Sequence, residues 1–187
     1  MSKAELLLQR YAQLIRYWGS RLNLLSDADL ERLEDRHLAD SLRLAPLIDD
    51  LEDGPAVDVG SGAGLPGIPL AISDPARWWR LLEPRKKRSA FLEEVVRELD
   101  LPNCEVLTKT AREAAADPAL RERHAVATAR ALAPPHQALP KLRPLVRPGG
   151  VCLLLAGSVA ELPPEADWAG PGIARLVVPP AKEGPGA

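Results

Sequence analysis

The residues whose types and spacing suggest binding chemistry lie together at residues 57–69, "VDVGSGAGLPGIP". A backbone needs so many glycines only where it turns tightly or lies very close to a ligand. An acid, Asp58, comes first, and Gly60, Gly62 and Gly64 follow it at alternate positions. The apolar run before the glycines is typical of a buried strand. We therefore expect a strand that leads into a glycine turn, with a ligand bound against the turn.

The elements around this turn are expected to form an α/β fold. From Pro55 onward short apolar strands alternate with helical segments, which predicts a parallel sheet with helices on both faces. Such a sheet binds ligands at the carboxyl ends of its strands, where the glycine turn lies. Strands are expected at residues 56–59, 77–83, 104–108, 125–130, 149–156 and 173–179, and helices at residues 65–73, 86–99 and 136–146.

The first fifty residues are predicted to be helical. Helices are expected at residues 3–18, 27–35 and 36–45, the second capped by Ser26 and the third ending near Pro46. The chain is thus expected to have an N-terminal helical extension at residues 1–50 and a core at residues 51–187, together one compact unit. At the other end, residues 162–172 are expected to be a loop and residues 179–187 a frayed tail. Because no strand follows residues 173–179, the last hairpin of the sheet is expected to be incomplete.

Composition limits the possible partners. The 187 residues carry a net charge of −2, so a nucleic acid could bind only at a local basic patch. The two cysteines, Cys104 and Cys152, lack the spacing of metal ligands and are expected to be reduced core thiols. No apolar run approaches the length of a membrane span, and the N-terminus lacks the apolar segment of a signal peptide. We expect a soluble cytoplasmic domain that uses neither a membrane nor a metal.

Two cofactors fit the glycine turn. Residues 62–67 match G-x-G-x-x-G, and Glu83 follows at the distance of a ribose-binding acid, which is typical of NAD-dependent oxidoreductases. Asp58 with the alternate glycines instead resembles motif I of class I S-adenosylmethionine (SAM) methyltransferases. Pro66 and Pro69 remove N–H donors that a pyrophosphate would need. SAM carries no phosphate, so the turn favours SAM, although NAD stays open; Glu83 suits the ribose of either.

Longer strings narrow the resemblance. They are "WGSRLNL" (18–24), "RHLADSL" (36–42), "DVGSGAGLPGIPLAI" (58–72), "KKRSAFL" (86–92) and "ARAL" (129–132). Over residues 17–157 the chain resembles the RsmG family, also called glucose-inhibited division protein B, the bacterial 16S rRNA guanine-N7 methyltransferases. The resemblance implies a Rossmann-like class I SAM-dependent methyltransferase fold. It also implies methyl transfer from SAM to N7 of a guanosine in the 530 loop, with 16S rRNA or the small ribosomal subunit as partner.

The resemblance also implies site residues. It places Gly60 and Leu65 at the cofactor, with Gly62 and Gly64 in the same turn. It places Ala111 and Arg112 at the adenine and Arg130 beside the cofactor. The resemblance to motif I of the class I SAM methyltransferases places Asp58 near the methionine end. Arg130 is expected at the end of the fourth strand, where its donors could meet guanine or the methionine carboxylate, and it is the candidate catalytic residue. Guanine N7 has a free lone pair, so the reaction needs no general base.

Two basic segments are candidates for RNA contact. One is Arg36 with His37, although Arg36 and Asp40, and His37 and Ser41, are neighbours on the helix, and a salt bridge with a hydrogen-bonded histidine could instead fix the N-terminal helices to the sheet. The other is the run Arg85, Lys86, Lys87 and Arg88 at a helix start.

Three features depart from the family pattern. Ala156 stands where a lysine is usual, Arg112 stands where an acid is common, and the C-terminus is short. Two alternatives to the methyltransferase stay open: an NAD-dependent oxidoreductase, and a module that binds SAM or rRNA without catalysing.

Overall fold

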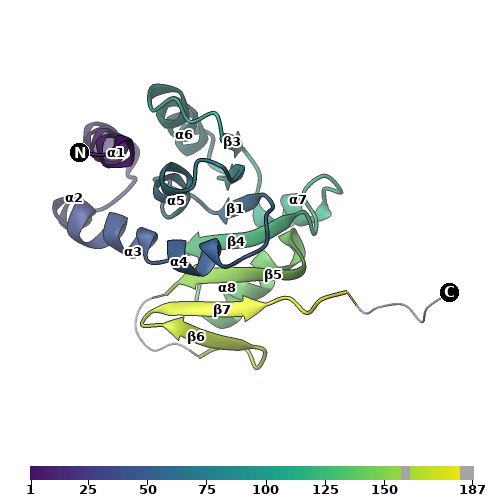
Figure 1. Cartoon of the computed structure of the whole chain (residues 1–187). Coiled ribbons are helices and arrows are strands. Elements are labelled where there is room, and N and C mark those ends of the chain that lie inside the picture. The colour runs from purple at the N-terminus through teal and green to yellow at the C-terminus, as the bar shows by residue number, and fades with distance from the viewer. Residues whose placement is uncertain (157–160, 182–187) are drawn as a thin grey trace.

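The computed structural model describes residues 1–156 and 161–181, and over these residues it contains a seven-stranded sheet (Figure 1). The strand order is β3-β2-β1-β4-β5-β7-β6. Neighbours among β1–β5 are parallel, whereas β7 is antiparallel to both β5 and β6. The strands are β1 (Ala56–Val59), β2 (Trp79–Leu82), β3 (Cys104–Leu107), β4 (His124–Arg130), β5 (Val146–Leu155), β6 (Ala166–Gly170) and β7 (Ile173–Val177).

The strand order reverses between β1 and β4, and this reversal fixes where a ligand can bind. The chain runs outward from β1 through β2 to β3 and then returns to β4 on the other side of β1. The connections that leave the carboxyl ends of β1 and β4 therefore diverge and leave a crevice between them. The glycine turn leaves β1 at this point, as the sequence predicts.

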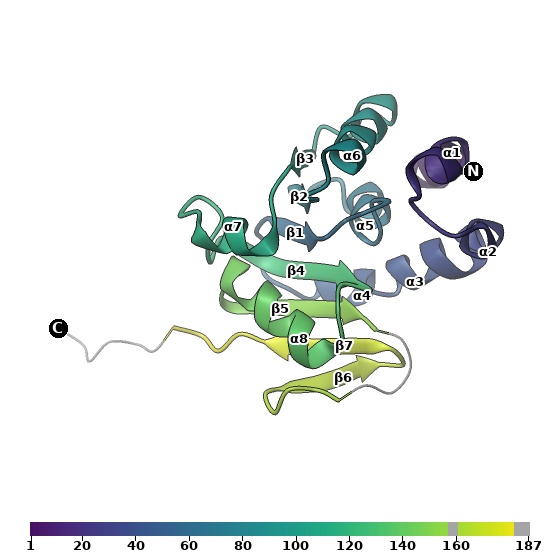
Figure 2. The same ribbon diagram turned by 180° about the vertical axis from the view of Figure 1, so that it is seen from behind.

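Helices cover both faces of the sheet, as expected (Figures 1 and 2). On one face lie α5 (Gly67–Ser73) and α6 (Lys86–Glu98), with α1 (Lys3–Leu22) packed on both. On the other face lie α7 (Ala111–Ala116) and α8 (Pro135–Leu142), which a short 3-10 turn (Arg143–Leu145) joins to β5. Successive side chains of a strand point to opposite faces of the sheet. Ala56 therefore packs in the apolar core under α1, α5 and α6, and Val57 packs in the core under α7 and α8.

The N-terminal helices differ in their bounds from the prediction. α2 (Asp27–Glu31) is short, a π-helix follows at Leu33–Leu38, and α3 (Ala39–Leu42) and α4 (Ala45–Asp49) complete the segment. The predicted helices at residues 27–35 and 36–45 are therefore wrong where they meet. Pro46 lies in the first turn of α4 rather than near the end of a helix. Proline is tolerated there because the N–H of a first-turn residue has no acceptor within the helix.

Two elements are absent from the sequence prediction. Strand β6 lies inside the expected loop at residues 162–172 and pairs with β7, so the expectation of an incomplete hairpin is wrong. Its small and polar residues, with prolines on either side of it, do not show the strand pattern. Helix α7 is set by a capping box, in which Thr110 and Glu113 each bond the other's backbone N–H. Most of the expected tail, residues 182–187, lies outside the described residues.

Both cysteines are buried and free, as expected of core thiols. Burial raises the pKa of Cys104 and of Cys152 to about 12, so neither thiol is a nucleophile at neutral pH. Among the described residues, no helix combines the length and the apolar character that crossing a membrane requires.

Candidate functional site

Asp58 anchors the glycine turn to the neighbouring elements of the fold. Its side chain is fully buried; one carboxylate oxygen accepts the hydroxyl of Thr128 at 3.0 Å and the other accepts the backbone N–H of Gly67 at 3.3 Å. Burial raises the pKa of Asp58 to about 6, and the bonds from Thr128 and Gly67 oppose the rise. The carboxylate therefore fastens the turn to α5 and β4, and it lines neither of the two cavities described below.

The glycines of the turn serve two different purposes. Gly60, Gly62 and Gly64 all have positive φ angles, +72°, +57° and +94°. A Cβ on Gly64 would lie 2.7 Å from Ile68 and 2.8 Å from the Tyr11 hydroxyl, so this glycine is required by internal packing. A Cβ on Gly62 would make only ordinary van der Waals contacts, with the Arg88 guanidinium and the Gly60 carbonyl, both at 3.8 Å. Gly62 thus offers a bare backbone to a ligand.

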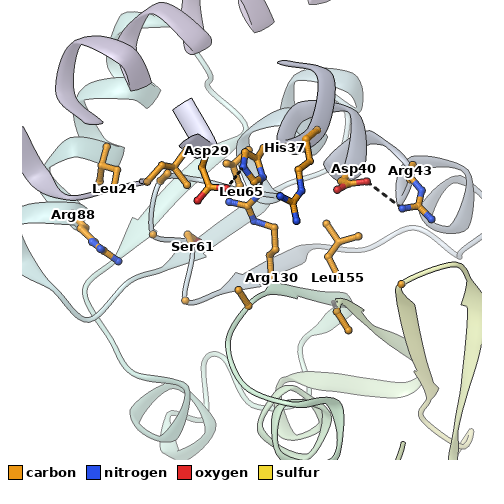
Figure 3. Close-up of a pocket in the computed structure, with 18 residues that line it drawn as sticks. Leu24, Asp29, His37, Asp40, Arg43, Ser61, Leu65, Arg88, Arg130 and Leu155 are labelled. Carbon is orange, nitrogen blue, oxygen red and sulfur yellow. Dashed lines mark hydrogen bonds and ion pairs between the residues drawn. The ribbon is translucent and has the colours of Figure 1, made fainter. Parts of the chain in front are cut away.

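Two cavities lie on either side of this turn. The first, of about 510 Å³, is enclosed by the turn, the π-helix and the ends of β4 and β5, and its wall includes Gly60, Ser61, Gly62, Ala63, Leu65, Arg36, His37, Asp40 and Arg130 (Figure 3). The second, of about 470 Å³, lies between the ends of β1 and β2 and the start of α7. Gly60, Arg88, Arg130 and Ala131 line both cavities, so the two adjoin along the end of β4.

Glu83 closes one side of the second cavity. Its carboxylate accepts the backbone N–H of Gly62 at 3.0 Å and that of Arg85 at 2.9 Å, and the side chain is nearly inaccessible to solvent. Each carboxylate oxygen can accept a further hydrogen bond. Ala111 and Arg112, in the first turn of α7, lie on the same cavity wall. The structure thus brings together Glu83, Ala111 and Arg112, which the sequence predicts for the ribose and adenine.

Arg130 ends β4, and its side chain extends into the space between the cavities. The next residue, Ala131, has a φ of +49°, so the chain turns away immediately after the arginine. One guanidinium nitrogen bonds Nδ1 of His37, and Nε2 of His37 lies 2.9 Å from a carboxylate oxygen of Asp29 (Figure 3). Within the described residues no carboxylate forms an ion pair with Arg130. Burial lowers the pKa of Arg130, although a guanidinium remains protonated.

In the "RHLADSL" segment the predicted Arg36–Asp40 salt bridge is wrong, whereas His37 is hydrogen-bonded and joins the N-terminal helices to β4, as expected. Asp40 pairs with Arg43 at 3.2 Å rather than with Arg36 (Figure 3), and the Ser41 hydroxyl donates to the main-chain carbonyl of His37 rather than to its ring. The π-helix turns these side chains away from the α-helical positions assumed in the prediction. Arg36 is consequently left in the wall of the first cavity.

The basic run at the start of α6 is divided by the fold. Arg85 and Arg88 line the second cavity, and Arg88 also donates to the carbonyl of Asn23 at 2.6 Å. Lys87 lies on a groove between α1 and α6, and Lys86 lines none of these hollows. Only part of the run therefore reaches the cavities directly.

Sequence reasoning missed three residues that support the site. Tyr11 donates from its buried hydroxyl to the carbonyl of Ala63 at 2.7 Å, which fixes the turn to α1. Thr128 bonds Asp58, and Asp29 bonds His37. No spacing signal in the sequence links these residues to the site, since each contact joins separate elements.

Comparison with models of known protein families shows to which family this chain belongs. A family model described as "rRNA small subunit methyltransferase G" matches residues 4–167. The chain belongs to this family, GidB.

Curated GidB relatives agree. The chain is 34% identical over 151 residues to a ribosomal RNA small subunit methyltransferase G from Acetivibrio thermocellus, covering 81% of this chain and 62% of that protein. It is 43% identical over 170 residues to one from Nocardioides, covering 90% and 64%. A third, from Gluconobacter oxydans, is 39% identical over 166 residues, covering 86% and 80%. The chain thus spans less than two thirds of the length of the first two relatives.

Solved structures confirm the fold class of this GidB chain. A Corynebacterium glutamicum protein superposes with a TM-score of 0.65 at 14% identity, covering 93% of this chain and 91% of the other. M. jannaschii TYW2, solved in complex with AdoMet, superposes with a TM-score of 0.52 at 20% identity, covering 63% and 51%. The fold is that of the class I SAM-dependent methyltransferases, as the sequence predicts.

Proposed function

We propose that this GidB-family protein transfers a methyl group from SAM to N7 of a guanosine in 16S rRNA, the guanosine being in the 530 loop. Its partner is the rRNA or the small ribosomal subunit that contains it. The observation that supports this most directly is the meeting of two cavities at Arg130. The second cavity has the buried Glu83 carboxylate that suits a nucleoside, the glycine turn lines the first, and both walls carry cations that suit a nucleic acid.

The residues around the turn fit SAM. Glu83 offers carboxylate oxygens to ribose hydroxyls, and Ala111 and Arg112 lie where the adenine would follow. Gly60, Gly62 and Leu65 line the first cavity, so they would contact the ligand directly, whereas Asp58 and Gly64 shape the turn. Arg130 supplies a guanidinium with no carboxylate partner among the described residues, and the carboxylate of an amino-acid group would satisfy it.

The same turn disfavours NAD. A dinucleotide places its pyrophosphate on the free N–H groups at the start of the helix after the turn. Here the Gly67 N–H donates to Asp58 and the Ile68 N–H donates to Gly64, at 2.8 Å. Pro66 and Pro69 have no N–H at all. The start of α5 therefore has no donors to give to a pyrophosphate.

The proposed chemistry is mainly placement. Bound SAM supplies an electrophilic methyl group, and guanine N7 presents its lone pair without deprotonation. The protein then has to hold N7 in line with the methyl carbon and the sulfur, which converts a bimolecular step into an effectively unimolecular one. Arg130 can orient a ligand group at the junction, because it ends β4 and lines both cavities.

For the RNA we propose contacts from Arg36, Arg85 and Arg88, with Lys86 and Lys87 on the adjoining surface. These cations are local, since the whole chain has a net charge of −2. Each would neutralise a phosphate, and binding should then weaken as salt is raised. His37 lines the first cavity together with Arg36, but its ring nitrogens already bond Asp29 and Arg130. Its contribution to RNA binding is therefore secondary.

Two experiments test the proposal. The first measures thermal unfolding with SAM, S-adenosylhomocysteine or NAD, and stabilisation by NAD alone would overturn it. The second incubates small subunits that lack the modification with the protein and labelled SAM, and maps N7-methylguanosine by chain cleavage. Cleavage at a single guanosine of the 530 loop is expected. Binding of SAM without any new cleavage site would instead identify a module that binds and does not catalyse.

A further inference from the structure

We propose that Asp29 and His37 are positioning residues that hold the Arg130 guanidinium in the orientation that receives the carboxylate of the SAM amino-acid group. This inference rests on the proposed function. Three elements contribute one residue each: α2 carries Asp29, the π-helix carries His37 and β4 carries Arg130. Figure 3 shows the histidine ring between the acid and the arginine.

The hydrogen bonds determine the protonation of the ring. A guanidinium can only donate, so Nδ1 of His37, which bonds Arg130, must be the bare acceptor nitrogen. Nε2 then carries the proton and donates to Asp29 at 2.9 Å. The ring is thus neutral with its proton on Nε2. Burial lowers the pKa of His37, and the charge of Arg130 lowers it further, which favours this neutral form.

A break in the helix makes the contact possible. Asp29 and His37 are eight residues apart, and in one continuous α-helix they would be separated by about 12 Å along the axis. α2 ends at Glu31, Arg32 has φ −107° and ψ 22°, and the π-helix begins at Leu33. Asp29 is itself fixed, because its other carboxylate oxygen accepts the Ser26 hydroxyl at 2.6 Å. Because the helix is interrupted between α2 and the π-helix, the Asp29 carboxylate, held by Ser26, lies within hydrogen-bonding distance of His37.

A histidine in this place has a chemical consequence. A carboxylate bonded directly to Arg130 would compete with an anionic ligand for the guanidinium. A neutral imidazole instead occupies one donor edge without cancelling the charge, and it transmits the anchoring of Asp29. The remaining donors stay available in the junction of the two cavities. This arrangement suits the capture of a ligand carboxylate.

The test compares two ligands by calorimetry: S-adenosylhomocysteine, which has the amino-acid carboxylate, and methylthioadenosine, which lacks it. For His37→Ala we expect about tenfold weaker binding of S-adenosylhomocysteine and less than twofold change for methylthioadenosine. His37→Gln should stay within about threefold of the natural protein, because glutamine offers one acceptor and one donor. His37→Glu should bind S-adenosylhomocysteine at least as weakly as His37→Ala, since its carboxylate would pair with Arg130.

Asp35 provides a matched control for Asp29, because it is an exposed acid on the same segment. Asp29→Ala should weaken S-adenosylhomocysteine severalfold, whereas Asp35→Ala should not. Nitrogen-15 NMR of the ligand-free protein should show His37 protonated on Nε2 alone. Equal loss for both ligands in His37→Ala, or a proton on Nδ1, would overturn the positioning role. If the natural protein binds neither ligand, the proposed function fails instead, and the NMR result still decides whether the bonded chain exists.

Discussion

Replacing Asp58 with asparagine should remove one source of the pH dependence of this protein's free energy of unfolding. The carboxyl is fully buried beneath the glycine turn. Burial raises its pKa from 3.8 to about 6, and the bonds from Thr128 and Gly67 only partly offset that rise. The folded protein therefore binds this proton more tightly than the unfolded chain does. The free energy of unfolding should carry a signature of that difference.

The sign and the size follow from linkage. A carboxyl whose pKa is higher in the folded state favours folding most at low pH, and this contribution is lost as pH rises through about 6. A shift of about two pKa units corresponds to ~3 kcal/mol at about 1.4 kcal/mol per unit. Roughly 2 kcal/mol of it should be lost between about pH 4 and pH 7.

The asparagine variant keeps the local geometry. Its amide oxygen can accept the Gly67 N–H, and its NH₂ group can donate to the Thr128 hydroxyl, which both accepts and donates. Urea unfolding of both proteins from pH 4 to pH 7 gives the difference between their free energies of unfolding at each pH. The contributions of the other titrating groups are the same in both proteins and cancel in this difference. The natural protein should lose ~2 kcal/mol relative to Asp58→Asn over this range. Exposed Asp35→Asn is the control. A flat difference, or one that rises with pH, would refute the reasoning.

Three further predictions concern the turn and its surroundings. Gly62→Val should fold with a strain cost of about 1–2 kcal/mol yet lose SAM binding in calorimetry, and unchanged SAM affinity would mean that the turn is not the site. Gly64→Ala should lower the unfolding temperature much more than Gly62→Val does, because its Cβ meets Ile68 and Tyr11. Tyr11→Phe should cost about 1–2 kcal/mol in urea unfolding, since it leaves a buried carbonyl unpaired, and a cost near zero would show that the bond is weak. The double change Lys86→Ala and Lys87→Ala should weaken rRNA binding and reduce its salt dependence in filter binding while SAM affinity stays unchanged, and an equal loss of SAM affinity would contradict a surface role.

The sequence predicts most of the sheet because its signals are local. Strands β1, β4 and the end of β5 are short buried runs of mainly apolar residues, and the glycines of the turn are residues that tolerate positive φ. Strand β6 escaped because its small and polar residues are not apolar in alternation, and it pairs only at an edge. Helix α7 could have been found from Thr110 and Glu113, whose spacing is that of a capping box.

The site itself is only partly local. Glu83 and Arg130 could be placed because each ends a strand, and strand ends converge at the ligand edge of such a sheet. The contacts of Asp29, His37 and Tyr11 depend on how the N-terminal helices pack against the sheet. The π-helix at Leu33–Leu38 has no recognisable sequence pattern, so a regular helix was predicted there and the pairings of Arg36 and Asp40 were wrong.

The bond between Tyr11 and Ala63, and that between His37 and Arg130, join residues 52 and 93 positions apart. Each of these contacts closes a long loop, at an entropic cost that grows only slowly with loop length. During synthesis, the N-terminal helices must wait until β4 has left the ribosome before His37 can meet Arg130. The cavity wall that these two bonds support therefore cannot be complete before β4 has been synthesised.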